Sequence, residues 1–360
     1  MEIGIIGLPQ SGKTTLFAAL LGESAPKATA GRPGPQVGVV KVPDARLQVL
    51  EAMFHPKRTV FAEIRFWDVA ERTFTKDEGI GSQIVNTLRQ ADALLHVVRV
   101  FGNESVPHSE GSVDPERDVA TVNLELAFSD LALLETRLQR LDASLRGAKG
   151  LERESYLREH ALLGRIKEQL ERDIPIREQS LTQEEWRAID MYRFLTAKPL
   201  MVVYNLGEEQ RGEIEVWEKQ ADGQRARLLA LALCAKLEAE LAQMQADEAA
   251  QFRAALGWHE VGRGRIIRGA YELLGYISFL TVGPDEVRAW SIVSGTTAQA
   301  AAGKIHSDME KGFIRAEVVS FAHLTQCGSL AETRKRGLMR LEGKNYPVLD
   351  GDVITFLFNV

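Results

Sequence analysis

The run Gly7-Leu8-Pro9-Gln10-Ser11-Gly12-Lys13-Thr14 decides the fold of this chain. It fits the phosphate-loop pattern G-x-x-x-x-G-K-S/T, in which glycines let backbone N–H groups turn toward phosphate oxygens. The surroundings also fit, because the apolar run Ile3-Gly4-Ile5-Ile6 precedes the loop and a helical pattern from Thr15 to Leu21 follows it. Strand, loop and helix in this order predict an α/β nucleotide-binding domain.

Two side chains of the loop carry its chemistry. Lys13 is predicted to bridge the two terminal phosphates, and the hydroxyl of Thr14 to ligate Mg²⁺. The residues that we expect to contact the nucleotide in this segment are Pro9, Gln10, Ser11, Gly12, Lys13, Thr14 and Thr15.

The composition is that of a globular protein with a slight acidic excess. The chain has 360 residues, which at roughly 150 residues per domain predicts two or three domains. Apolar residues make up 45% and charged residues 26%, a usage that excludes collagen-like, disordered and low-complexity chains. With 44 basic and 50 acidic residues the net charge is −6, so no overall positive field draws the chain to nucleic acid or to an anionic membrane. Any contact with RNA must come from a local patch.

Cysteine usage and the first residues indicate a cytoplasmic protein. The two cysteines, Cys234 and Cys327, lie far apart in sequence, which excludes a disulfide framework and a Cys-rich metal site. No basic segment precedes the apolar run that begins at Ile3, and no stretch reaches the roughly 18 uninterrupted apolar residues of a membrane span. We therefore predict a cytoplasmic protein without a membrane partner.

Further runs of strand length follow the phosphate loop. They are Val37 to Val40, Phe61 to Ala70, Leu94 to Val100 and Pro199 to Tyr204, and the last two have the β-branched, apolar character of buried parallel strands. Between these two, a segment from Glu125 to about Arg193 is dense in Leu, Glu and Arg at helical spacing and predicts an antiparallel helical hairpin. The hairpin either packs only on itself or offers a surface to a partner.

The pattern changes after Leu256-Gly257 to short strand-like runs that continue to Phe358, which predicts a separate β-rich domain. The predicted division is a discontinuous nucleotide-binding domain of residues 1–124 and 196–277, an inserted hairpin of residues 125–195 and a C-terminal domain of residues 278–360.

Asp68 is the predicted second ligand of the metal. It ends a strand, at the place where phosphate-loop enzymes keep the carboxylate that holds Mg²⁺ directly or through water, although a strand-end Asp also serves as a helix cap. Glu71 stands three positions on, where a glycine usually contacts the γ-phosphate, so this contact is in question. Gly79 and Gly81 are either hinges of a switch segment or ordinary loop glycines.

Base choice is predicted from Asn205-Leu206-Gly207-Glu208, which follows a strand as the N-K-x-D motif of guanine-binding proteins does. Leu206 replaces the Lys that packs on the base, and Glu208 replaces the Asp whose carboxylate accepts two hydrogen bonds from guanine. A site without that bidentate acceptor loses its discrimination against adenine, so ATP competes with GTP. The alternative is a polar strand-end loop without a ligand. Cys234-Ala235-Lys236 resembles the S-A-K loop that closes over the base through backbone N–H groups.

The order of these motifs resembles that of the Obg-like ATPase (YchF) family of translation-factor-like P-loop NTPases, over nearly the whole chain. Further matching stretches are Val42-Pro43-Asp44-Ala45-Arg46-Leu47, Arg89-Gln90-Ala91-Asp92-Ala93, Ala301-Ala302-Gly303-Lys304-Ile305-His306-Ser307-Asp308, Leu341-Glu342-Gly343-Lys344 and Asp350-Gly351-Asp352-Val353.

The resemblance implies a Ras-like P-loop NTPase domain, an inserted α-helical coiled-coil hairpin and a C-terminal TGS domain of β-grasp type. It also implies binding of ATP in preference to GTP, and association with ribosomes. K⁺ is a second candidate ion beside Mg²⁺. We expect the protein to be a monomer. A local basic patch either faces ribosomal RNA or is a solvated surface. Its members are Lys304, His306, Lys311, Arg315 and Lys344.

Three positions depart from the family pattern or bear on catalysis. Arg32 stands where the switch region normally carries a Thr, and Gln10 stands where the phosphate loop usually has Asn. The family lacks the Gln that orients the attacking water in Ras-like enzymes, and His108 matches the position of a loop His considered as its substitute. The alternative for His108 is an exposed loop histidine without a catalytic part.

Three functional hypotheses follow. The first is a slow ATPase in which Lys13 and Mg²⁺ neutralise developing charge and a partner accelerates turnover. The second is a nucleotide-binding adaptor with little or no hydrolysis, which Glu71 and Arg32 favour. The third is a GTPase, which Leu206 and Glu208 oppose.

Overall fold

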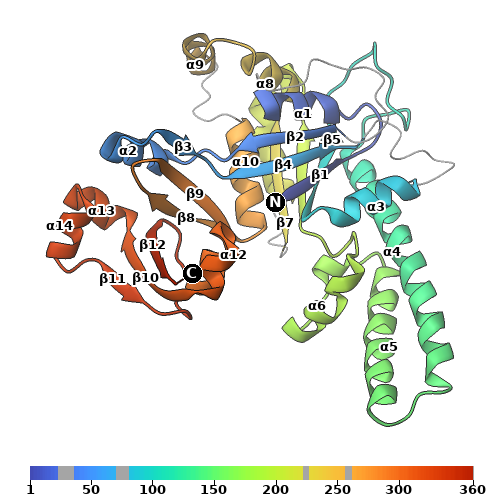
Figure 1. Cartoon of the computed structure of the whole chain (residues 1–360). Coiled ribbons are helices and arrows are strands. Elements are labelled where there is room, and N and C mark those ends of the chain that lie inside the picture. The colour runs from blue at the N-terminus through green and yellow to red at the C-terminus, as the bar shows by residue number, and fades with distance from the viewer. Residues whose placement is uncertain (23–35, 70–80, 222–226, 256–261, 360) are drawn as a thin grey trace. The chain divides into compact units, whose positions relative to one another are not determined.

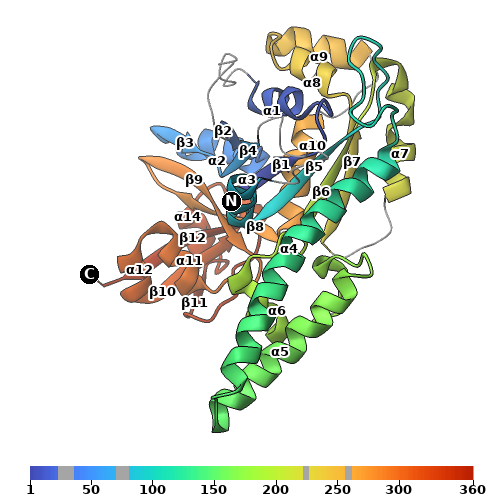
Figure 2. The same cartoon turned by 90° about the vertical axis from the view of Figure 1, so that its right-hand side faces the viewer.

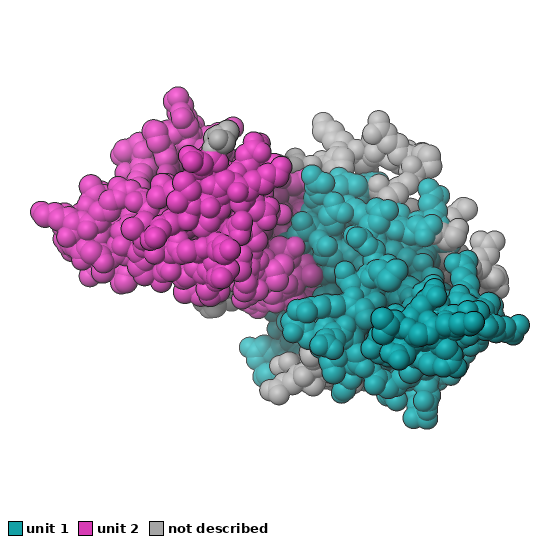
Figure 3. Space-filling model, turned by 60° about the horizontal axis from the view of Figure 1, so that its bottom comes forward, with its two compact units in different colours: residues 1–38, 65–266 teal, residues 39–64, 267–360 magenta. Residues whose placement is uncertain are grey.

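The computed structural model of the chain describes residues 1–22, 36–69, 81–221, 227–255 and 262–359. The chain forms two compact units, one of residues 1–38 and 65–266 and the other of residues 39–64 and 267–360 (Figure 3). The sequence did not indicate that residues 39–64 belong with the C-terminal residues. The three functional domains with the boundaries given above stay a prediction.

A six-stranded sheet forms the centre of the first unit, with the strand order β2-β4-β1-β5-β6-β7 (Figure 1). The strand pairs from β4 through β1, β5 and β6 to β7 are all parallel. This arrangement confirms the predicted α/β fold class. The strands are β1 (Glu2–Ile6), β2 (Gln36–Lys41), β4 (Glu63–Asp68), β5 (Ala93–Arg99), β6 (Leu200–Asn205) and β7 (Leu228–Leu233).

Parallel pairing places the carboxyl ends of these strands at one edge of the sheet and the amino ends at the other. β5 is buried over its whole length, as its apolar sequence predicts. The residues that follow β1 and end β4 and β6 therefore meet at the carboxyl edge, which is where ligands bind in such sheets. The helices that connect or follow the strands are α1 (Lys13–Leu21), α3 (Ser82–Gln90), α7 (Ile214–Ala221), α8 (Ala235–Leu241), α9 (Ala246–Ala255) and α10 (Gly262–Leu273), with the 3₁₀ helix η4 (Glu208–Glu213).

The inserted hairpin consists of α4 (Pro115–Leu145) and α5 (Gly150–Leu170), which run side by side (Figure 2). Asp114 caps α4 by accepting from the backbone N–H of Arg117. Buried residues of α4 change from the sheet core, at Leu126, to the hairpin core, at Leu134. The predicted boundary at residue 125 therefore falls inside a continuous helix, near the point where that helix leaves the sheet.

The chain returns from the hairpin to β6 through η2 (Ile176–Glu178), α6 (Gln183–Ile189) and η3 (Asp190–Tyr192). The fully buried carboxylate of Asp130 fixes this return, because it accepts from the backbone N–H groups of Leu195 and Thr196. In the described part of the chain, no helix has the length and apolar character needed to cross a membrane.

The second unit contains a mixed six-stranded sheet of order β11-β10-β12-β8-β9-β3 with short helices, as expected for a C-terminal domain of β-grasp type. Its core includes Phe279, Val318 and Phe356. The strands are β3 (Arg58–Val60), β8 (Tyr276–Val282), β9 (Glu286–Val293), β10 (Phe313–Ser320), β11 (Arg340–Glu342) and β12 (Asp352–Phe358). The helices are α2 (Ala45–Phe54), α11 (Ala298–Ile305), α12 (Ser307–Lys311), α13 (Phe321–Cys327) and α14 (Leu330–Lys335).

Residues 39–64 belong to this unit through pairing and charge. β3 pairs in parallel with β9, and Arg58 lies 2.7 Å from Glu286. Arg46 of α2 donates to Asp44, at 2.8 Å, and to Asp350, at 2.7 Å, and these two carboxylates raise the pKa of its guanidinium. Residues 39–64 are thus held in the second unit by contacts with residues far away in the sequence. The predicted division had placed this segment in the nucleotide-binding domain.

Candidate functional site

The phosphate loop begins at the carboxyl end of β1, and its two pattern glycines are required by the backbone. Gly12 has φ +95°, and a Cβ there would collide with Nδ2 of Asn205. Gly7 has φ +149°, and a Cβ there would collide with the carbonyl oxygen of Val97. Gln10 also lies in the left-handed region, with φ +61°. Asn enters this region more readily than Gln, which gives a physical reason for the Asn usual in the resembling family.

Lys13 is held inside the loop by backbone carbonyl groups. Its side chain belongs to the buried residues, and Nζ donates to the carbonyl oxygens of Gly7, at 3.0 Å, and Leu8, at 2.8 Å. The ammonium group therefore lies within the loop at the start of α1, where the helix amino terminus also favours an anion. The predicted contact of Lys13 with the two terminal phosphates stays a prediction.

Thr14 and Asp68 lie side by side at the same edge. The register between β1 and β4 places Asp68 opposite Ile5, and the Thr14 hydroxyl donates to Oδ2 of Asp68 at 2.9 Å. A hydroxyl and a carboxylate are the hard oxygen donors that Mg²⁺ prefers. No group of three or more His, Cys, Asp or Glu side chains suited to a metal occurs among the described residues.

The sequence also singled out positions in the predicted switch segments, which follow Thr14 and Asp68 along the chain. Arg32, Glu71 and Gly79 lie outside the described residues. Gly81 precedes α3 with φ −55°, a conformation that does not require glycine.

Asn205 joins the phosphate loop to the loop after β7. Its side chain is 4% exposed; Nδ2 donates to the carbonyl oxygen of Ser11, and Oδ1 accepts from the backbone N–H of Ala235, both at 3.0 Å. Both ends of the amide are thus used to fix one predicted nucleotide-contacting segment against another. The predicted contact of this residue with a base stays a prediction.

The neighbouring predicted base contacts have different environments. Leu206 is 2% exposed and packs in a small core cluster with Val100 and Ala232. The exposed Glu208 carboxylate accepts from Nζ of Lys236 at 2.8 Å, and this hydrogen bond lowers the pKa of Glu208. The thiol of Cys234 is buried, which raises its pKa.

His108 is not the exposed loop histidine that we offered as its alternative role. Its side chain is 3% exposed, Nε2 lies 2.8 Å from Oδ2 of Asp118, and Nδ1 accepts from the backbone N–H of Glu110 at 3.1 Å. Because Nδ1 accepts, the neutral ring carries its proton on Nε2 and donates to Asp118. The exposure assumed in that alternative was wrong, because the carboxylate of Asp118, in the first turn of α4, contacts the ring. A catalytic role for His108 stays a prediction, and it requires these bonds to open.

His96 is a residue that sequence reasoning missed. It lies in β5 opposite Ile6, is 1% exposed, and neither ring nitrogen has a hydrogen-bond partner in the described part of the protein. Burial, followed by the positive charges of Lys13 and Arg177, lowers its pKa to about 3. A neutral imidazole thus lies near the ammonium group of the loop. The only sequence signal was a histidine in a strand whose other residues, apart from Arg99 at its end, are apolar.

The parallel sheet, the glycine-bounded loop and the Thr14–Asp68 pair define a nucleotide-binding protein of the P-loop class. Family profiles agree. Residues 2–129 match a family described as 50S ribosome-binding GTPase, and residues 276–359 match YchF-GTPase_C, described as a protein of unknown function.

Relatives over the full length identify the family within this class. The chain is 38% identical to the "Ribosome-binding ATPase YchF" of Bacillus subtilis, covering 100% of both chains. It is also 38% identical to the protein of that name in Escherichia coli O157:H7, covering 100% of this chain and 99% of the relative. The chain belongs to the YchF family.

A solved structure supports the same identification. The YchF GTPase of Schizosaccharomyces pombe superposes with a TM-score of 0.88 at 30% identity, over 99% of this chain and 97% of the other. The resemblance drawn from the motifs is thereby confirmed, together with the predicted fold class.

Proposed function

We propose that this protein is a Mg²⁺-dependent ATPase of low intrinsic activity that works on the ribosome. The observation that carries the proposal is the Thr14 hydroxyl 2.9 Å from Asp68, directly beside the loop that holds Lys13. The relatives named ribosome-binding ATPases support both the nucleotide and the partner.

The residues of the chain suggest how the reaction is assisted. Thr14 and Asp68 would hold Mg²⁺, which supplies a charge that neutralises the β- and γ-phosphate oxygens. Lys13 would exchange the carbonyl oxygens of Gly7 and Leu8 for phosphate oxygens and stabilise the same developing charge. His108, the catalytic candidate among the described residues, is not free to act as a base for the attacking water in this conformation, since both of its ring nitrogens are engaged by protein groups. A low basal rate follows.

The contact between Glu208 and Lys236 supports ATP over GTP. Guanine recognition uses a carboxylate that accepts two hydrogen bonds from the base, and Lys236 competes with the base for this carboxylate because its Nζ donates to Oε1 of Glu208. Adenine makes no such demand. GTP stays the alternative nucleotide, and K⁺ stays a candidate second ion.

A nucleotide-binding adaptor is the second candidate function, and the locked state of His108 favours it. In that case ATP only orders loops for a ribosomal partner. The partner surface that we propose is the basic set named above, in which Lys304 lies in the last turn of α11 and Arg315 lies in β10. A cytoplasmic location and a monomeric state belong to the same proposal.

Calorimetric titration with non-hydrolysable ATP and GTP analogues in Mg²⁺ tests nucleotide binding. Lys13→Ala should weaken ATP-analogue affinity at least about 100-fold, or about 2.7 kcal/mol, because the phosphates lose their principal cation. Lys149→Ala, at an exposed position before α5, is the control for removing one lysine. Unchanged affinity in Lys13→Ala would refute the assignment of the site.

Single-turnover hydrolysis with and without ribosomes separates the two candidates. We expect slow ATP cleavage that ribosomes accelerate. ATP that stays intact under both conditions would establish the adaptor, and tighter binding of the GTP analogue would move the protein to the GTPases.

A further inference from the structure

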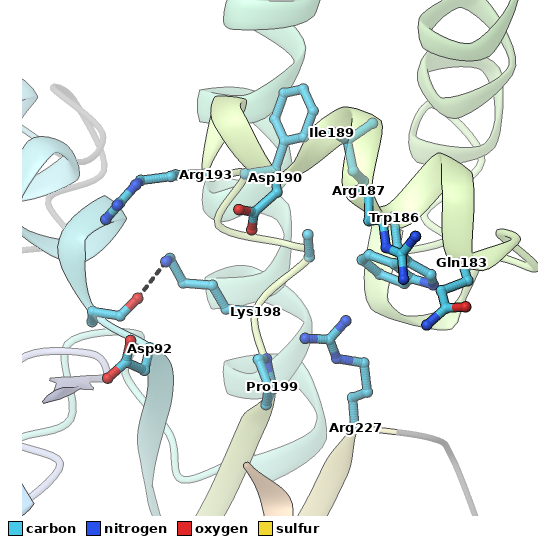
Figure 4. A pocket seen from close by; sticks show the side chains of 13 residues that line it. Asp92, Gln183, Trp186, Arg187, Ile189, Asp190, Arg193, Lys198, Pro199 and Arg227 are labelled. Carbon is cyan, nitrogen blue, oxygen red and sulfur yellow. Dashed lines mark hydrogen bonds between the residues drawn. The ribbon is translucent and has the colours of Figure 1, made fainter. Parts of the chain in front are cut away.

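A cavity of about 650 Å³ lies at the amino edge of the nucleotide-binding sheet, the edge opposite the phosphate loop. Its lining comes from the residues just before β5, β6 and β7 and from α6 and η3, all within the first unit. Figure 4 shows that Lys198 and Arg193 extend toward the start of β5, near Asp92, while Arg227 approaches Trp186. The volume is in the range of small-molecule sites.

The cavity gathers cations that lack carboxylate partners. In the described part of the chain, the guanidinium groups of Arg187, Arg193 and Arg227 make no ion pair and no hydrogen bond. Of the two lining carboxylates, Asp92 already accepts from the backbone N–H of Glu2 at 2.8 Å. This local excess of positive charge occurs in a protein whose net charge is −6.

Arginines elsewhere in the same unit are commonly paired. The guanidinium of Arg137 lies 2.6 Å from Glu159, and that of Arg172 lies 2.6 Å from Glu168. Other arginines of this unit, such as Arg153 and Arg158 of α5, also make no ion pair among the described residues. What distinguishes Arg187, Arg193 and Arg227 is that all three line one cavity.

Lys198 adds a recessed fourth cation. Its Nζ donates to the backbone carbonyl oxygens of Arg89, at 2.9 Å, and Ala91. Burial and the neighbouring charge of Arg193 lower the pKa of Lys198 to about 8. Arg193 and Lys198 thus repel each other. Three carboxylates act on the pKa of Lys198 in the opposite direction without cancelling the decrease, namely those of Asp92, Asp130 and Asp190. An anion between the two cations would relieve their repulsion.

The backbone at two of the arginines is strained. Arg193 has φ +49° and Arg227 has φ +67°, and these are two of only five non-glycine residues with positive φ in the described part of the chain. The guanidinium of Arg227 lies over the ring of Trp186, 4.5 Å from its centroid, a contact that orients the group without using its N–H donors. Strain held at a cavity is a recurrent property of binding sites.

We propose that this cavity binds a small, multiply charged phosphate anion, of the size of pyrophosphate or the polyphosphate part of a nucleotide. Guanidinium forks match phosphate oxygens in pairs, and several cations from separate segments suit more than one phosphoryl group. The site is distinct from the phosphate loop, since the two lie at opposite edges of the sheet. It does not depend on the proposed ATPase activity.

The test is a calorimetric titration of the full chain with pyrophosphate, in EDTA and in the Lys13→Ala background, so that the phosphate loop does not compete. Arg193→Asn/Arg227→Asn removes two cations of the cavity, and Asn adopts positive φ readily, so the fold is preserved. We expect pyrophosphate to bind at least tenfold more weakly to this variant. Lys198→Met should weaken binding independently.

The control is Arg153→Asn/Arg158→Asn, which removes the same charge from exposed, unpaired positions of α5 and should leave affinity unchanged. Equal affinity in the cavity variant and the control, or no saturable binding of pyrophosphate to the unmodified cavity, would overturn the proposal. A short RNA oligonucleotide is titrated in parallel. Binding of the RNA but not of pyrophosphate at these arginines would overturn the small-anion assignment and make the cavity a contact for a nucleic-acid backbone.

Discussion

The two edges of the nucleotide-binding sheet hold their charged groups differently. At the carboxyl edge, Lys13 donates to loop carbonyl oxygens, and Asp68 accepts from Thr14. At the amino edge, Arg193 and Arg227 have no ion-pair partner in the described part of the chain and occupy strained backbone positions. At both edges a lysine donates to backbone carbonyl oxygens, Lys13 at one and Lys198 at the other. The difference is that the arginines of the amino edge have no such internal bonds.

The largest effect should come from the carboxyl edge. Gly12→Ala places a Cβ against Nδ2 of Asn205 in a left-handed backbone, so the loop must deform. We expect affinity for an ATP analogue to fall at least about 100-fold, measured by calorimetry. Gly147→Ala, which has open space around it, is the control. Pyrophosphate binding at the amino edge should survive Gly12→Ala, and its loss would show that the two edges are not independent.

His96 lies in β5, the strand that runs between the edges, and should make stability depend on pH. Its folded-state pKa of about 3 lies below the unfolded value of 6.5. As the pH falls below 6.5, the imidazole of His96 becomes protonated in the unfolded chain but stays neutral in the folded chain. The free energy of unfolding therefore falls by about 1.4 kcal/mol per pH unit until the pH approaches 3. His96→Leu removes this dependence, because Leu has no group to protonate.

Urea unfolding at pH 7, 6 and 5 measures this pH dependence of the free energy of unfolding. Relative to the parent, His96→Leu should gain about 2 kcal/mol of unfolding free energy between pH 7 and pH 5. His323→Leu, at an exposed position of α13, controls for removing a histidine. If the parent and His96→Leu lose stability in parallel, the neutral buried state of His96 is wrong.

The smallest effect should come from the amino edge. Arg193→Asn relieves a left-handed backbone strain and removes a cation next to Lys198, so we expect a gain in stability of about 0.5 kcal/mol. Thermal unfolding in the absence of phosphate measures it. A clear loss of stability would mean that Arg193 serves the fold, and the contrast between the edges would disappear.

Local features were predictable from the sequence. The phosphate loop occupies adjacent residues, and its strand and helix carry the apolar patterns that define them. The hairpin was equally visible, because helical spacing persists over many turns. To predict that Thr14 and Asp68 lie together, one further rule was needed, namely that parallel strands have their carboxyl ends at the same edge of a sheet.

Features assembled from distant segments were not predictable. The amino-edge cavity takes Arg193, Lys198 and Arg227 from separate places, and each is an ordinary basic residue in its own sequence neighbourhood. The burial of His108 depends on Asp118, which the sequence presents only as part of a helix start. No local sequence pattern predicts contacts between residues that lie far apart in the chain.

The pairing of β3 with β9 has a consequence for synthesis. Thr59 lies opposite Val287, 228 residues further along the chain. At about 5 to 20 residues per second, a nascent chain waits roughly 10 to 45 s between making the first strand and making its partner. β3 therefore leaves the ribosome early and pairs with its partner strand late. For the same reason no single cut in the polypeptide releases either unit intact, so shuffling of these units between genes by simple end-to-end fusion is excluded.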